Sequence, residues 1–161
     1  MAQSTFLPTE TVPKFNKETA QFFLKKAKKE ASDNEDMTRF CIDKALSFTS
    51  SQEHLRLTAD WILNEKVQIE DEEIKIELTS TQKYTICKRF WASADFSLDE
   101  KKALRDKALT GDDSDQAQNV RKVLDWSLPD ADLKARLWDE INDSQTKDSL
   151  MELRLKIQGF W

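Results

Sequence analysis

Apolar side chains recur at steps of three and four residues along most of the chain, which is the period of an amphipathic α-helix. Polar clusters and capping residues divide this pattern into eight helical segments. Ser50-x-x-Glu53 and Ser97-x-x-Glu100 are capping boxes, and they open the third and fifth segments. The sequence predicts helices at about 17–31, about 35–47, from Ser50 through Leu63, at about 80–94, from Ser97 to near Thr110, from the Asp112–Ser114 cap, from Asp130, and at about 146–158.

Single residues mark the start of the first helix and the end of the last one. Asn16 is a good N-cap and is expected to start the first helix, whereas Gly159 is expected to be the C-terminal cap residue of the last one. The two final helices are expected to bury one apolar stripe each, formed by Leu133, Leu137, Trp138 and Ile141 in one helix and by Leu150, Leu153 and Ile157 in the other.

Residues 64–80 break the helical pattern. Ile74, Ile76 and Leu78 alternate with polar residues, as in a strand, but the neighbouring segment Glu70–Glu73 is strongly acidic. The sequence offers no second convincing strand to pair with this one, and a lone strand is not stable. We therefore expect a loop with an extended piece.

Residues 1–15 contain Pro8 and Pro13 and show no periodicity, so they are expected to form an extended leader. Residues 16–161 are then one helical-repeat domain, which we expect to be part of a longer array. Short polar connections make successive helices antiparallel neighbours. The predicted fold is all-α, with stacked helical hairpins that resemble an irregular HEAT or armadillo array, and a compact helical bundle is the alternative.

The charge, the apolar content and the cysteines of the chain exclude several classes of function. The 161 residues carry 25 basic and 30 acidic side chains, which gives a net charge of −5. Basic and acidic residues are mixed along the chain without long runs of one sign, so no basic surface for nucleic acid is expected. No apolar run approaches the roughly 20 residues that span a bilayer, and the N-terminus does not resemble a signal peptide. We expect a cytoplasmic protein without membrane insertion, with Cys41 and Cys87 as buried thiols rather than a disulfide or a reactive thiol.

Few residues of the chain could support catalysis. His54 has no second histidine one helical turn away, so the chain cannot supply the ligand pair of a zinc protease helix, and a solvent-facing or cap-adjacent position is expected for it. Gly111 and Gly159 are isolated, which excludes a glycine-rich phosphate loop. Acidic pairs such as Asp112-Asp113 are expected to cap helices rather than hold calcium. We expect no catalytic residue, metal or cofactor in this chain.

Five tryptophans are many for a chain of this length. Trp91 and Trp138 lie on predicted core stripes, whereas Trp61 and Trp126 fall off the main apolar face of their helices. Tryptophans off the stripe in a helical array usually contact the neighbouring hairpin, and an exposed binding surface is the alternative. We also expect Phe160 and Trp161 to pack near Trp138 and Leu153 or against a partner. Candidate packing or partner-contact residues are Trp61, Trp126, Phe160 and Trp161.

The order of several segments in this sequence resembles that of a known protein family. Residues 76–89 form an extended turn leading into a helix, and they are followed by the helical segments 99–108 and 115–124. A Pro129-x-x-x-x-Lys134-x-x-x-Trp138 helix and a closing Gly159-Phe160 complete the order. From Leu55 to Trp161 this order resembles part of the helical C-terminal domain of the zinc aminopeptidases, which include aminopeptidase N and the endoplasmic-reticulum aminopeptidases.

The resemblance implies a non-catalytic role. The family's His-Glu-x-x-His zinc helix, its Gly-x-Met-Glu-Asn loop and its catalytic tyrosine belong to other domains, so zinc is expected only in a catalytic domain located elsewhere. This segment would close over or support the peptide-binding cavity of that domain, which is in the same chain or a separate one. The alternative is a stand-alone helical-repeat interaction module or assembly subunit that binds another protein.

Overall fold

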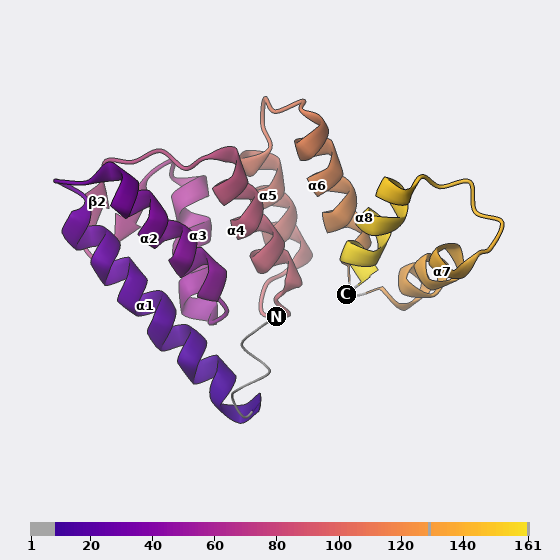
Figure 1. Ribbon diagram of the computed structural model, residues 1–161, viewed down its shortest axis with the longest axis horizontal. Helices are drawn as coiled ribbons and strands as arrows, with labels where there is room; N and C mark the ends of the chain where they lie inside the picture. The colour runs from indigo at the N-terminus through magenta and orange to yellow at the C-terminus, as the bar shows by residue number, and fades with distance from the viewer. Residues whose placement is uncertain (1–8, 129, 161) are drawn as a thin grey trace. The chain divides into compact units, whose positions relative to one another are not determined.

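The computed structural model describes residues 9–128 and 130–160, and these form an all-α structure with one small β-hairpin (Figure 1). The predicted fold class is therefore confirmed. The chain divides into two compact units, Met1–Ala108 and Leu109–Trp161. Each unit is described by itself.

Unit 1 is a series of helices in which most contacts join helices close in the sequence, and α2 contacts α4 (Figure 1). α1 packs along α2, and both α3 and α4 contact α5. The elements are η2 Thr9–Thr11, α1 Val12–Glu30, α2 Glu35–Phe48, α3 Gln52–Leu63, β1 Val67–Ile69, β2 Glu72–Ile74, α4 Ser80–Ala92 and α5 Leu98–Ala108.

Polar side chains start the helices of unit 1 largely as the sequence predicts. Asn34 caps α2 by accepting a hydrogen bond from the backbone N–H of Met37, and Thr79 forms a full capping box with Gln82 at the start of α4. Ser97 and Glu100 bond reciprocally before α5, which confirms that capping box. The cap of α3 is Ser51, one residue after the predicted one.

The N-terminal prediction is wrong in part. α1 begins at Val12 rather than after Asn16, so residues 12–15 of the expected leader are helical, and a short 3₁₀ turn at Thr9–Thr11 precedes them. Pro13 does not prevent this, because proline lacks only an N–H that has no partner in the first helical turn. Residues 1–8 of the expected leader lie outside the described residues.

The acidic segment forms a β-hairpin rather than a loop with one extended piece. β1 and β2 are antiparallel, with Val67 opposite Ile74, and Glu70 in the turn between them has a φ of 56°. Lys28 of α1 binds the carboxylates of Glu70 at 2.8 Å and Glu72 at 3.1 Å, which ties the hairpin to α1. The sequence did not reveal β1, the partner strand, because it lies before the acidic segment and has three residues, too few to show alternation.

Basic side chains bind backbone carbonyl groups that lie at or beyond helix ends. Such carbonyls have no partner within a helix and need a donor from elsewhere. In unit 1, Arg89 donates to the carbonyl oxygens of Ser47 at 2.6 Å and Thr49 at 3.1 Å, at the end of α2. In unit 2, Arg121 donates to the carbonyl oxygens of Leu109 and Asp112. These bonds link segments that are separate in the sequence.

The thiols and the histidine of unit 1 are buried. Cys41 and Cys87 are free thiols in the core, which confirms the prediction, and burial raises the pKa of Cys87 to about 12. His54 lies next to the α3 cap, where its backbone N–H donates to Ser51 Oγ, so the cap-adjacent alternative is confirmed and the solvent-facing one is wrong. The imidazole is buried, and its Nδ1 has no hydrogen-bond partner in the described part of the chain. It lies on the same helical face as the core residues Leu55 and Thr58 of α3.

We expect the burial of His54 to make the fold less stable in mild acid. Burial lowers the pKa of His54, an effect that Glu53 opposes and Lys17 reinforces. The folded chain therefore resists a proton that the unfolded chain binds below a pH of about 6.5, so stability falls as the pH drops from there to the folded pKa. The slope is at most about 1.4 kcal/mol per pH unit.

Urea unfolding of the wild type and of His54→Leu between pH 7.5 and pH 5.5 measures this contribution. The wild type should lose more stability than the variant over that range, because the variant has no imidazole to protonate. Parallel losses in the two proteins would contradict the prediction and assign the pH dependence to carboxylates.

Unit 2 consists of α6 Asp115–Trp126, α7 Ala131–Asn142 and α8 Leu150–Phe160, with α8 in contact with both other helices (Figure 1). Ser114 caps α6 and Asp130 caps α7, as predicted. The stripe predicted for α8 is wrong, because its buried residues are Leu155, Lys156 and Gly159 rather than Leu150, Leu153 and Ile157. In α7 only Leu137 of the predicted stripe is buried, and Trp138 is 53% exposed.

Candidate functional site

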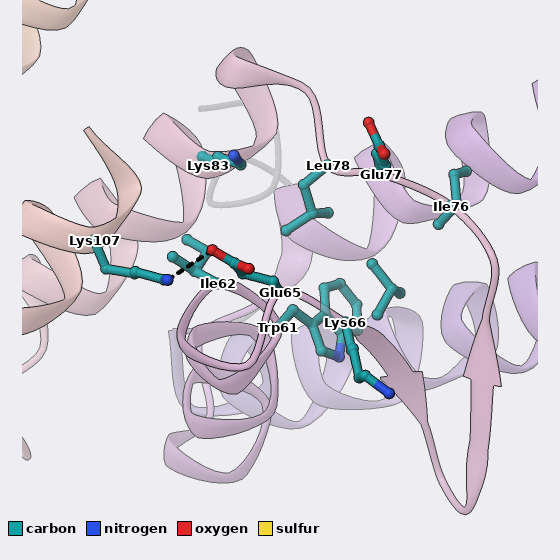
Figure 2. A pocket seen from close by; sticks show the side chains of 10 residues that line it. Trp61, Ile62, Glu65, Lys66, Ile76, Glu77, Leu78, Lys83 and Lys107 are labelled. Atoms are coloured by element: carbon teal, nitrogen blue, oxygen red, sulfur yellow. Dashed lines mark ion pairs between the residues drawn. The ribbon is translucent and has the colours of Figure 1, made fainter. Parts of the chain in front are cut away.

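A cavity of about 330 Å³ in unit 1 has the size of a small-molecule site (Figure 2). It lies between the end of α3, the β-hairpin, the extended segment 76–78 and one lysine each from α4 and α5. Apolar side chains and a rim of charged groups line it. The lining residues are Trp61, Ile62, Glu65, Lys66, Val67, Ile76, Glu77, Leu78, Lys83 and Lys107.

Ion pairs order the charged rim of this cavity. Lys107 Nζ lies 2.6 Å from Glu65 Oε1, and this contact lowers the pKa of Glu65, with a smaller effect from Lys83. Figure 2 shows Lys107 reaching toward Glu65, while Lys66 extends toward the hairpin. Lys66 Nζ lies 2.8 Å from Glu73, whose carboxylate raises the pKa of the lysine. These pairs are exposed and hold the rim only weakly.

The lining of this cavity combines charged and apolar side chains. Among the described residues that line it are lysines, glutamates and apolar side chains, with no serine, cysteine or histidine to act as a nucleophile or its base. The sequence did not suggest this site, because Glu65, Lys83 and Lys107 come from three separate segments and form no motif.

Trp61 holds the β-hairpin against α3. Its ring is buried, and its Nε1–H donates a hydrogen bond of 2.6 Å to the backbone carbonyl of Gln68 in β1. The sequence predicts contact with the neighbouring helical hairpin or an exposed binding surface, and the structure shows this tryptophan buried and hydrogen-bonded to the β-hairpin that follows α3. Trp61 also forms part of the cavity wall, so it links the hairpin to the candidate site.

We expect Trp61→Phe to loosen the hairpin without unfolding unit 1. Phenylalanine keeps an aromatic ring in the core but removes the donor to Gln68, at a cost of about 1 kcal/mol for one hydrogen bond. Amide hydrogen exchange in residues 66–75 should accelerate about fivefold, while exchange in α1 and α2 stays unchanged. Unchanged exchange in the hairpin would show that the hydrogen bond contributes nothing.

The second candidate feature is a cluster of contacts centred on Lys134 in unit 2. Lys134 Nζ donates to the carbonyl oxygens of Trp126 at 2.8 Å, Gly159 at 2.6 Å and Phe160 at 3.0 Å. Burial lowers the pKa of Lys134. One ammonium group from α7 thus binds the C-terminal ends of α6 and α8, so it joins all three helices of the unit.

Aromatic and glycine contacts surround this lysine. The rings of Trp138 and Phe160 lie 5.6 Å apart, as expected for Phe160, and Lys134 lies over the Phe160 ring at 5.7 Å. Gly159 is inside α8 rather than at its C-cap, and a Cβ at this position would lie 2.5 Å from the Cβ of Trp126. The glycine is therefore needed for close helix packing rather than for a left-handed cap.

The predicted contact residues have different positions in the structure. Trp61 is buried in unit 1, whereas Trp126 and Phe160 are half-buried in the Lys134 cluster of unit 2. Trp161 lies outside the described residues. The structure thus brings Trp126 and Phe160 together through Lys134, and it places Trp61 in a different unit.

Metal-binding clusters, membrane-spanning helices and similarity to known proteins also bear on function. Within residues 9–128 and 130–160, no group of three or more histidine, cysteine, aspartate or glutamate side chains could hold a metal ion. In the same part of the chain, every helix is too short or too polar to cross a bilayer. Comparison of the chain with protein-family models, with curated proteins and with solved structures found no match.

Proposed function

We propose that this chain is a non-catalytic helical segment of a zinc aminopeptidase, which closes over or supports the peptide-binding cavity of a catalytic domain located elsewhere. The observation that supports the proposal is the Lys134 cluster. Lys134, Trp138, Gly159 and Phe160 are among the residues on which the family resemblance rests, and they meet at one point between α6, α7 and α8.

This convergence gives the resemblance a physical meaning. Lys134 is separated from Gly159 by 25 positions and from Phe160 by 26, yet it binds the carbonyl groups of both. These contacts hold a three-helix unit together, which suits a structural segment better than a catalytic one.

The proposal predicts that the purified chain with added zinc does not hydrolyse an aminoacyl reporter substrate. The matched sample is the same chain with the metal removed by a chelator. Zinc-dependent hydrolysis that the chelator abolishes would overturn the proposal. A zinc-helix motif, His-Glu-x-x-His, in the same reading frame or in a chain that binds this one would support it.

A stand-alone protein-interaction module is the second candidate function. The observation that favours it is the apolar surface of unit 2, where Leu150 is 67% exposed and Trp138 is 53% exposed. Large apolar side chains gathered on one surface commonly mark a contact with another protein. Stop codons on both sides of the coding segment would favour the module over the aminopeptidase segment.

A further inference from the structure

α8 exposes three large apolar side chains and buries one lysine, which is unusual for a surface helix. Leu150 is 67% exposed, Met151 56% and Ile157 43%, whereas Lys156 is buried and forms ion pairs with Glu140 and Asp148. Surface helices normally direct apolar side chains inward and charged ones outward. We name Leu150, Met151, Arg154 and Ile157 the α8 outer face.

The apolar surface continues from α8 onto α7. Phe160 lies one turn after Ile157 and contacts Trp138 of α7, whose ring is more than half exposed. The surface therefore extends along α8 from Leu150 to Phe160, about three turns, and includes one side chain of α7. Apolar side chains spaced along one helix in this way suit contact with another helix.

Arg154 stands at the centre of the α8 outer face. It lies three or four residues from Leu150, Met151 and Ile157, so all three apolar side chains surround it on the helix surface. Arg154 is exposed and makes no hydrogen bond or ion pair with any residue that the structure describes. An occupant of this face would cover the guanidinium, and an unpaired charge is costly to bury, so the occupant needs an acidic partner for it.

We propose that the α8 outer face binds an amphipathic helix of a partner protein whose apolar stripe carries one glutamate or aspartate opposite Arg154. A second copy of this chain suits the face poorly. Two-fold pairing of the face about its centre would place Arg154 against Arg154 of the other copy, and like charges at a contact are unfavourable. An anionic lipid surface would meet a chain of net charge −5.

The inference is independent of the proposed aminopeptidase function, and it deepens the second candidate function, because both rest on the exposed apolar side chains of unit 2. It can fail while the peptidase assay leaves the proposed function intact, and the reverse also holds. The test uses the full chain and two synthetic amphipathic helices of about 18 residues, which is about five turns. The peptides share one leucine stripe and differ only in a glutamate or a lysine at its centre.

Isothermal titration should show that the wild-type chain binds the glutamate peptide at least about tenfold more tightly than the lysine peptide, because the lysine would face Arg154. Arg154→Glu should reverse this preference. Arg136→Glu, on an exposed position of α7, is the matched control and should keep the wild-type preference. Ile157→Asp should abolish binding of both peptides, and circular dichroism establishes that each variant is folded.

Several results would overturn the proposal. Equal affinity for the two peptides, or no binding of either, would exclude an acidic helix as the occupant. A dimer in sedimentation that Ile157→Asp dissociates would assign the face to a second copy. Adsorption to phosphatidylcholine–phosphatidylserine vesicles that the same variant abolishes, without peptide binding, would assign it to lipid.

Discussion

Lys134→Met is expected to open the α6–α8 unit and leave unit 1 folded. The methionine keeps an unbranched apolar stem of similar length, so the packing along α7 changes little. It removes the ammonium group that satisfies the carbonyl oxygens of Trp126, Gly159 and Phe160. Hydrogen bonds to a charged donor contribute more than neutral ones, and three orphaned carbonyls at partly buried helix ends cost about 2–4 kcal/mol.

Hydrogen exchange measured by segment is the suitable test of the Lys134→Met prediction, because a global melt mixes the two units. Amides of α6 and α8 should exchange at least about thirtyfold faster, since 1.4 kcal/mol corresponds to a factor of ten. The matched control is Lys147→Met in the same unit, where the lysine is exposed and its loss should change nothing. Similar exchange in the two variants would show that Lys134 is not the link between the helices.

The sequence predicted the helices well where caps and apolar spacing agree. In α5, Ser97 and Glu100 mark the start, and Leu104 and Ala108 then fall on the buried side. A cap fixes one end of a helix through local hydrogen bonds, so it can be identified without knowing the fold. The start of α1 was predicted at the wrong residue. Asn16 has the side chain of a good N-cap, whereas Thr11, the N-cap in the structure, makes no side-chain cap bond.

The buried side of α8 could not be predicted from its sequence. Leu150, Met151, Leu153, Leu155 and Ile157 are spread around the helix, so apolar spacing alone does not select one face. Contacts from outside the helix decide the orientation: Gly159 fits against Trp126, and Lys156 reaches the carboxylates of Glu140 and Asp148. Such long-range pairs leave no local signal in the sequence.

The candidate sites also differ in how far the sequence predicts them. Two of the aromatic residues that the sequence singles out make contacts between elements, because a large ring gains most from close packing when it is buried. They are Trp61 and Phe160. The cavity of unit 1 depends instead on Glu65, Lys83 and Lys107, which resemble ordinary surface charges until the fold brings them together.

Gly159→Ala tests whether α8 is held by close packing on α6. Two effects oppose each other at this position. Alanine favours a helix over glycine by about 1 kcal/mol. A new Cβ, however, would lie 2.5 Å from the Cβ of Trp126 and 3.1 Å from the carbonyl oxygen of Val123.

We expect the steric effect of Gly159→Ala to prevail. The Cβ of Trp126 is attached directly to the α6 backbone, so no rotation of the side chain relieves the contact, and the two helices must move apart. Overpacking of this kind costs about 1–3 kcal/mol and occasionally more, and separation of the helices also lengthens the bonds from Lys134 to Gly159 and Phe160. The net effect is a loss of stability in unit 2.

Segment-resolved hydrogen exchange should show α6 and α8 less protected in Gly159→Ala than in the wild type, with α1–α5 unchanged. Gln158→Ala is the matched control, because it places alanine at the exposed neighbouring position, where helix propensity acts without the clash. If Gly159→Ala instead protects α8, propensity decides and the close contact with Trp126 is not a constraint. If it lowers protection as expected, Gly159 is required because α6 leaves no room for a side chain.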